Sequence, residues 1–562
     1  MKRFLALGLL VLCIPAQAQH YDVLIEGGTV YDGTGSEGQL VDIGIRADQI
    51  VAIGNLKADT ADLKLNVEGL AVAPGFINML SWATTSLLID GRSFGDIHQG
   101  VTLEVLGEGM SMGPLTPAMK ENLRRQQTET YSYEIPWTSL GEYLEHMVAK
   151  GVSPNVASFV GATTIRVHVL GYENRPPSDA ELEEMRTLVR QAMEEGAVGL
   201  SSALIYAPAF YADTDELTAL AKIAAEYDGM YISHMRSEGA RLLESVDELV
   251  QIARDSGARA EIYHLKIAGK ENWHKYDALI EKISSAQDEG LAITADMYTY
   301  TAGSTGLDAA MPPWVQEGGY EAWRARLKDP DIRARLAKEM ITPTDQWENL
   351  LLSAGPDKTL LVGFHNPDLR EYAGMTLAQV ASARGQSAVE TAMDLVIEDG
   401  SRVQVVYFLM SEENLDKMIQ LPYVSFGSDA ASMSASGVFL ERSTHPRAYG
   451  NFARVLGTYV REKKLLTLPE AVHKLTGLPA HNLRLKNRGL IKEGYFADIA
   501  IFDPKTVRDQ ATYDDPHQLS EGMHHVLVNG EAVLLNGKHT GALPGRVLRG
   551  PGYRPAAKKR LP

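Results

Sequence analysis

The sequence predicts an α/β protein, a (β/α)8 TIM-type barrel with a small discontinuous β-sandwich formed by the N- and C-terminal segments. Two observations predict this architecture. Strand-like and helical patterns alternate through the middle of the chain, whereas short strand-like runs gather at its two ends. Because each end segment is too small to stand alone, we expect the two to close into one sandwich beside the central barrel.

The alternation in the middle of the chain is marked by helix start and stop signals. Ser178 and Glu181 form a capping box before an amphipathic helix that Gly196 ends, and a strand-like run follows at 197–202. Thr214 opens the next helix. Repeated strand–helix units of this kind are typical of a parallel barrel.

The stretch 231–266 is the unit on which the functional prediction depends. An apolar run ends at His234, a helix follows and stops at Gly257, and a second run ends at His264. In a barrel, both histidines would lie at the carboxyl ends of their strands, where sites are assembled. Two converging imidazoles suit a metal such as zinc. The alternative is a pair of unrelated core histidines.

The end segments complete the domain prediction. The pair Asn529-Gly530 predicts a hairpin near the C-terminus. The predicted division is a signal peptide at 1–18, β-sandwich at 19–73, barrel at 74–485 with an insertion at about 306–353 that could cap its mouth, β-sandwich at 486–550 and a tail at 551–562.

The first residues have the pattern of an export signal. Lys2 and Arg3 precede the apolar run 4–14, and small residues follow at 16–18. We therefore expect a secreted, periplasmic protein that does not stay in the membrane after cleavage. Cys13 is the only cysteine, so the mature chain would contain neither a disulfide nor a thiolate metal ligand. The net charge of -18 argues against nucleic acid as a partner.

Two carboxylates at strand ends are further candidates. Glu108 lies in a Gly-flanked turn after a strand and could approach a metal, although a solvated loop glutamate is the alternative. Asp429 closes the run 424–429 and would be placed to accept the proton of a metal-bound water, with a helix cap as its alternative.

A set of short motifs in this chain resembles a known family. The motifs are Val72-Ala73-Pro74-Gly75-Phe76-Ile77, Gly100-Val101-Thr102, Ser233-His234-Met235-Arg236, His264-Leu265-Lys266, Tyr298-Thr299-Tyr300, Gly427-Ser428-Asp429 and His445-Pro446-Arg447-Ala448-Tyr449-Gly450. Each motif is weak alone, but their order over nearly the whole mature chain resembles the D-aminoacylase (N-acyl-D-amino-acid deacylase) branch of the amidohydrolase superfamily.

The resemblance implies roles for individual residues. His234 and His264 match the zinc ligands of the family, and Asp429 matches its catalytic aspartate. The residues that match substrate-binding positions are Lys266, Tyr298, Ser304, Met410 and Arg447. Lysine and arginine at such positions would complement a substrate carboxylate.

The chain departs from the superfamily pattern in two places. The first-strand Asp-x-His-x-His is replaced by 78–82, in which Leu80 and Trp82 cannot bind zinc and would form an apolar wall. The metal-binding cysteine of the family is also missing, and Glu108 occupies nearly its position. Two histidines and one glutamate leave a fourth zinc position open for water.

These observations predict a metal-dependent amidohydrolase with one Zn²⁺ per chain on Glu108, His234 and His264, and with Asp429 as general base. The expected partner is a small N-acyl (D-) amino acid or a short peptide with a free carboxylate. Two alternatives stay open: hydrolysis of cyclic or bulky aromatic amides in a pocket formed by Leu80 and Trp82, and a degenerate, non-catalytic binding protein.

Overall fold

The structure is a computed structural model that describes residues 18–555. The predicted signal peptide, with Cys13, lies outside the described residues except for its last residue, and so does most of the predicted tail.

Parallel strands form the centre of the molecule. One sheet has the order β10-β9-β8 and a second has the order β11-β12-β13-β14-β15-β19. Their bounds are β8 Phe76–Ser81, β9 Val101–Leu106, β10 Asn155–Ser158, β11 Val160–Gly161, β12 Gly199–Ala203, β13 Met230–His234, β14 Arg259–Ile262, β15 Ile293–Met297 and β19 Val424–Phe426. The two sheets meet at both edges, because β10 leads directly into β11 and a parallel bridge joins Ser81, in β8, to Ala430, just after β19.

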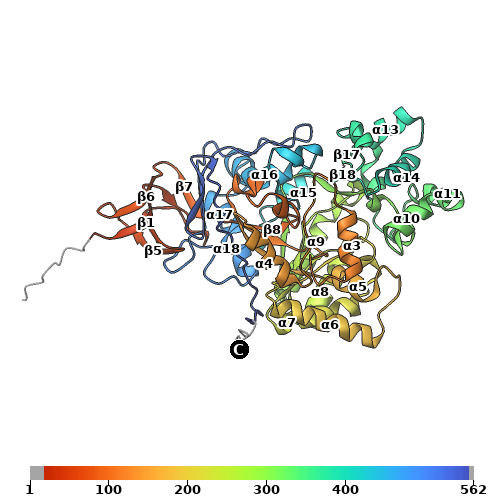
Figure 1. Ribbon diagram of the computed structural model, residues 1–562, viewed down its shortest axis with the longest axis horizontal. Helices are drawn as coiled ribbons and strands as arrows, with labels where there is room; N and C mark the ends of the chain where they lie inside the picture. Colours follow the sequence, from red (N-terminus) through yellow and green to blue (C-terminus); the bar gives the residue numbers. More distant parts are fainter. Residues whose placement is uncertain (1–17, 556–562) are drawn as a thin grey trace, which may run out of the picture.

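Helices pack around these strands and confirm the α/β class (Figure 1). Helix α6 begins with the predicted capping box of Ser178 and Glu181. Helix α8 ends as predicted at Gly257, whose left-handed backbone (φ 75°) terminates the helix. The helices outside the β15–β19 segment are α1 Ser86–Ile89, α2 Phe94–Ile97, α3 Pro117–Arg125, α4 Leu140–Lys150, α5 Ala162–Leu170, α6 Asp179–Glu194, α7 Thr214–Glu226, α8 Leu242–Ser256, α9 Tyr276–Asp288, α16 Arg447–Arg454, α17 Leu468–Leu475 and α18 Gly477–Asn482.

The two ends of the chain form sheets at one end of the molecule, where red and blue ribbons lie side by side (Figure 1). One sheet has the order β5-β4-β1-β6 and the other β23-β22-β21-β20-β7-β2-β3. Strand β20 pairs with β7 and so joins the C-terminal to the N-terminal segment. The strands are β1 His20–Glu26, β2 Thr29–Val30, β3 Gln39–Leu40, β4 Asp42–Arg46, β5 Gln49–Gly54, β6 Thr60–Asn66, β7 Ala71–Pro74, β20 Ile499–Phe502, β21 Met523–Val528, β22 Glu531–Leu535 and β23 Lys538–His539.

The predicted hairpin at Asn529-Gly530 connects β21 and β22, and both turn residues have positive φ. Apolar side chains from both ends of the chain, such as Ile43 and Ile499, share one core cluster.

Most of the segment between β15 and β19 lies at the opposite end of the molecule (Figure 1). It contains an antiparallel sheet of order β16-β18-β17 and several helices, which have a core cluster of their own. Its elements are β16 Ala302–Gly306, α10 Tyr320–Leu327, α11 Pro330–Glu339, α12 Leu350–Ala354, β17 Thr359–Gly363, α13 Leu377–Arg384, α14 Ala388–Asp399 and β18 Gln404–Phe408. Helix α15 Glu412–Met418, which follows them, packs in the core cluster of the central strands instead. The predicted insertion at 306–353 falls within this segment.

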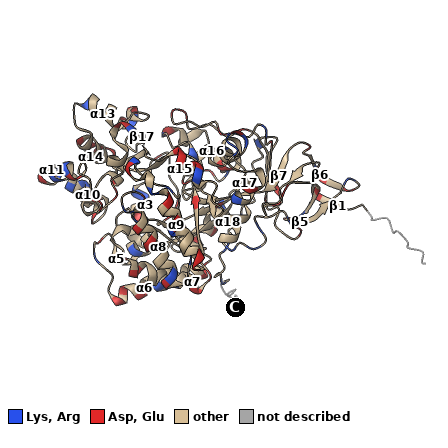
Figure 2. Cartoon of the chain, turned by 180° about the vertical axis from the view of Figure 1, so that it is seen from behind, with Lys and Arg blue, Asp and Glu red and all other residues tan. Residues whose placement is uncertain are grey.

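Charged residues of both signs lie on the helices, for example on α6 and, in the segment between β15 and β19, on α10 and α11 (Figure 2). Among residues 18–555, no helix has the length and apolarity needed to cross a membrane.

Candidate active site

The three predicted metal ligands lie together at the carboxyl ends of neighbouring strands. Glu108 follows β9, His234 ends β13 and His264 follows β14. Glu108 Oε1 lies 3.0 Å from His264 Nε2 and 3.3 Å from His234 Nδ1. The imidazole rings meet edge to face, with centroids 4.5 Å apart. Residues separated by up to 156 positions in the chain thus form one buried cluster.

The backbone at His264 is strained in a way that suits a functional position. Its φ is 36°, in the left-handed region that residues with a side chain adopt at a cost. The His264 amide donates a hydrogen bond of 3.0 Å to Oδ1 of Asp296, a buried residue of β15. This contact holds the turn that aims the imidazole at Glu108.

The electrostatics of the cluster favour an ionised Glu108. Burial opposes its ionisation, but hydrogen bonds from His234 and His264 outweigh burial and lower its pKa. Burial also opposes protonation of His264, yet Glu238 and Glu108 raise the pKa of that imidazole to about 10. A bound divalent cation would take the place of the imidazole protons that stabilise Glu108, so metal binding releases protons.

The cluster fits a divalent metal ion. One ligand atom from each of Glu108, His234 and His264 lies within 4.8 Å of the other two. His234 Nε2 is buried and has no hydrogen-bond partner among the described residues, which is costly unless a ligand satisfies it. Two imidazoles and one carboxylate are a donor set that zinc uses in hydrolytic sites.

Leu80 and Trp82, which were expected to form an apolar wall, lie at the end of β8. Leu80 is in β8 and is buried, while Trp82 follows the strand and is 37% exposed. The Trp82 indole Nε1 donates a hydrogen bond of 2.8 Å to Glu108 Oε2. Trp82 therefore contacts the ligand cluster through a polar atom, which the sequence did not indicate.

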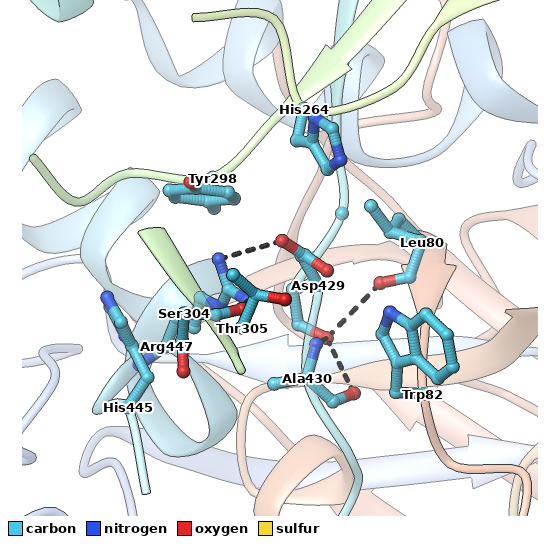
Figure 3. Close-up of polar contacts among 12 residues, drawn as sticks. Leu80, Trp82, His264, Tyr298, Ser304, Thr305, Asp429, Ala430, His445 and Arg447 are labelled. Carbon is cyan, nitrogen blue, oxygen red and sulfur yellow. Dashed lines mark hydrogen bonds and ion pairs between the residues drawn. The ribbon is translucent and has the colours of Figure 1, made fainter. Parts of the chain in front are cut away.

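Asp429 and Arg447 face each other across the mouth of the site (Figure 3). Arg447 Nη1 lies 2.8 Å from Asp429 Oδ2. Asp429 has a φ of 49°, and its amide donates to the carbonyl of Leu80. Burial raises the pKa of Asp429, although Arg447 opposes this shift. The Asp429 carboxylate is thus a stronger base than an exposed aspartate.

Lys266 is buried inside the site, and its ammonium group is bonded to other side chains of the protein. Its Nζ lies 2.6 Å from Glu238 Oε1 and 2.6 Å from His264 Nδ1. Glu238 Oε1 also lies 3.0 Å from His264 Nδ1. Sequence reasoning missed Glu238, whose position four residues after His234 carries no recognisable motif. A carboxylate on the outer nitrogen of a metal-binding histidine orients the ring and sets its tautomer.

The remaining predicted residues line the side of the site near Arg447. The Arg447 guanidinium stacks over the Tyr298 ring at 4.4 Å, and the Tyr298 hydroxyl reaches Met410 Sδ at 3.7 Å. Ser304 lies in β16, where its carbonyl accepts a 3.4 Å hydrogen bond from Arg447 Nη2 and its hydroxyl donates to Val405. The predicted positions therefore gather in one region, with Lys266 and Ser304 already bonded to other protein groups.

Comparison with known proteins places this fold and site in a class. A model of the amidohydrolase family matches residues 132–534, more than half of the chain. The protein therefore belongs to the amidohydrolase family and has the α/β fold of that superfamily. It is a hydrolase that acts on carbon–nitrogen bonds.

Within the family, the chain belongs to the D-aminoacylase group, as its motifs indicated. It is 32% identical to D-aminoacylase of Alcaligenes xylosoxydans xylosoxydans, over 95% of this chain and 98% of that protein. It is 33% identical to N-acyl-D-glutamate deacylase of the same organism, over 94% and 96% of the two chains. The crystal structure of N-acyl-D-glutamate deacylase from Bordetella bronchiseptica, complexed with zinc and a phosphonate inhibitor, matches with a TM-score of 0.79 and 29% identity, over 94% and 100% of the chains.

Proposed function

We propose that this protein hydrolyses the amide bond of N-acyl amino acids of the D series, or of short peptides with a free carboxylate, with one zinc ion per chain. The observation that carries the proposal is the buried convergence of Glu108, His234 and His264 beside Asp429. The similarity to D-aminoacylase and to two D-specific deacylases supports the substrate class and its stereochemistry.

The chain itself supplies three ligands, and Leu80 and Trp82 offer none, which favours a mononuclear centre. When bound to Glu108, His234 and His264, zinc would acidify a water molecule and polarise the scissile carbonyl. Asp429 would accept the proton of the attacking water and return it to the leaving nitrogen. Its pKa, which burial raises, makes Asp429 a stronger base than an exposed aspartate.

Arg447 is the residue we assign to the substrate carboxylate. Its Nε is buried without a hydrogen-bond partner in the described chain, so the guanidinium has an unused donor. Arginine binds carboxylates through two parallel hydrogen bonds, which fixes the orientation of a substrate. Tyr298 stacks under the guanidinium and keeps it in place. Lys266 would add positive charge at the same mouth.

Three further predictions are part of the same proposal. We interpret the parallel strands, joined edge to edge through Ser81 and Ala430, as the (β/α)8 barrel, and the terminal sheets as a β-sandwich. The pattern at 1–18 favours export to the periplasm.

A second candidate function is hydrolysis of bulky aromatic amides. Trp82 and Met110 are large apolar side chains that are 37% and 45% exposed. Trp82 contacts Glu108 directly, and Met110 lies two residues after Glu108 in the sequence. Exposed apolar groups beside a ligand cluster would bind a large acyl group better than acetyl. A panel of N-acetyl, N-benzoyl and cyclic amides of D- and L-amino acids separates the two candidates.

The experiment that tests the proposal is metal content per chain, measured in mature wild-type protein and in His234→Ala. We expect about one zinc in the wild type and its loss in the variant, because one of three ligands is removed. No stoichiometric metal in wild-type protein purified without chelator would favour the non-catalytic binding protein. Two metals per chain would contradict the mononuclear centre.

A further inference from the structure

We propose that Trp82 is a positioning residue for the metal-binding carboxylate: its indole N–H holds Glu108 Oε2 and so presents Oε1 to the metal and the two histidines. This inference rests on the metal centre proposed above. It assigns to Trp82, which offers no metal-binding atom, the task of hydrogen bonding to a ligand.

The two oxygen atoms of Glu108 have different partners. Oε1 lies 3.3 Å from His234 Nδ1 and 3.0 Å from His264 Nε2, so it faces the space where ligand atoms converge. Oε2 accepts a hydrogen bond of 2.8 Å from Trp82 Nε1. One oxygen atom of the carboxylate therefore faces the ligand cluster, and the other faces the indole.

The indole suits this task because of its chemistry. A tryptophan N–H only donates, so it cannot bind a metal ion and cannot exchange donor for acceptor as an imidazole can. Trp82 is thus the donor and Glu108 the acceptor whether the site holds a metal or not. A donor on the outer oxygen of a ligating carboxylate orients that ligand, and such outer contacts typically change metal affinity about 10- to 100-fold.

The backbones of both partners are fixed, which makes the hydrogen bond specific. The Trp82 amide donates to the carbonyl of Ala430 at 2.9 Å, next to the bridge that joins β8 to the segment after β19. Glu108 lies between Gly107 and Gly109, and a Cβ atom on Gly107 would come within 2.5 Å of the carbonyl of Phe159. The main chain beside Glu108 is therefore closely packed, and Trp82 restrains the Glu108 side chain.

The test compares Trp82→Phe with the wild type, because phenylalanine keeps an aromatic ring and removes the donor. The matched control is Trp314→Phe, since Trp314 Nε1 also donates 2.8 Å to a glutamate, Glu339, in the segment between β15 and β19. Zinc affinity is measured by competition with a chromophoric chelator. We expect Trp82→Phe to bind zinc about tenfold more weakly and Trp314→Phe to match the wild type.

A spectroscopic readout separates positioning from general destabilisation. In the cobalt-substituted protein, release of Oε2 lets both carboxylate oxygens reach the metal, and the higher coordination number weakens the visible d–d absorption. We expect this loss of intensity in Trp82→Phe but not in Trp314→Phe. Equal zinc affinity and an unchanged cobalt spectrum in Trp82→Phe would overturn the proposal.

The wild-type protein provides a second measurement if Trp82→Phe does not fold. The chain has 6 tryptophans, and ¹⁵N-labelled indole groups report each N–H by NMR. Addition of zinc draws charge from Glu108, so one indole N–H resonance should shift strongly. No shifted indole resonance at saturating zinc would contradict the contact. Wild-type protein that binds no zinc would refute the proposed metal centre instead.

Discussion

Asp429 Oδ2 and Arg447 Nη1 lie 2.8 Å apart, so the predicted general base is paired with the guanidinium assigned to the substrate. Both side chains are largely withdrawn from solvent, where an ion pair is screened weakly. The pair links two functions: Arg447 holds down the pKa of the base that burial raises. A substrate carboxylate that binds Arg447 would also lie next to Asp429.

Arg447→Met should therefore shift the pH dependence of activity as well as weaken substrate binding. Asp429 must be ionised to accept a proton, and loss of the positive charge raises its pKa further. We expect the acid limb of the kcat/KM profile to move upward by about one pH unit or more. Arg454→Met, at the other end of α16 where Arg454 pairs with Asp509, is the control. An unmoved acid limb in Arg447→Met would show that the pair does not set the pKa of the base.

Asp429→Asn should abolish the proton transfer while it leaves the metal ligands in place. The amide has the shape of the carboxylate but cannot accept the proton of the water, so kcat should fall by about a hundred- to ten-thousandfold. Zinc content should equal that of the wild type. A variant with near wild-type kcat would remove Asp429 from the mechanism, and a variant without zinc would make Asp429 a structural or ligand residue.

Replacement of Glu108 tests whether this carboxylate serves as the third ligand. Glu108→Ala should lose stoichiometric zinc, because two histidines alone hold the ion weakly. Glu108→Cys should retain it, since a thiolate is also a zinc ligand, and its thiol should be protected from modification when zinc is bound. Metal analysis and thiol titration measure the two effects. Full zinc content in Glu108→Ala would contradict the assigned ligand set.

Glu261 on β14 should make the stability of the protein depend on pH. It is fully buried, it accepts hydrogen bonds from Thr294 and Asn482, and burial raises its pKa to about 7 from the ordinary glutamate value of 4.5. A raised carboxyl pKa means that the folded state holds the proton more tightly than the unfolded state does. The stabilising contribution of Glu261 is therefore complete below about pH 4.5 and is lost as the pH rises through 7.

The wild type should lose about 3 kcal/mol of unfolding free energy as the pH rises from 4.5 through 7, and Glu261→Gln should not show this loss. Urea unfolding at pH 5 and pH 8 measures it, with the exposed Glu281→Gln as control. If the free energy of unfolding of the wild type and of Glu261→Gln change equally with pH, Glu261 does not titrate as described.

Much of the local structure follows from sequence patterns. The capping box of Ser178 and Glu181, the terminating Gly257 and the turn at Asn529-Gly530 each depend on residues close in the chain, and all three are present. The family was also predictable, because its motifs are ordered along the chain. The sequence did not indicate the contact of Trp82 with Glu108 or the role of Glu238, since no local pattern marks either.

The sequence by itself determined the order of strands and helices, the family and the absence of the first-strand histidines. Those features depend on residue type and short-range spacing, which set backbone preference and available chemistry. Only the tertiary structure decided that Glu108, His234 and His264 converge, that Lys266 is held by Glu238, and that Arg447 faces Asp429. These contacts join residues from different strand ends, loops and helices, so they exist only when the fold brings the carboxyl ends of the strands together.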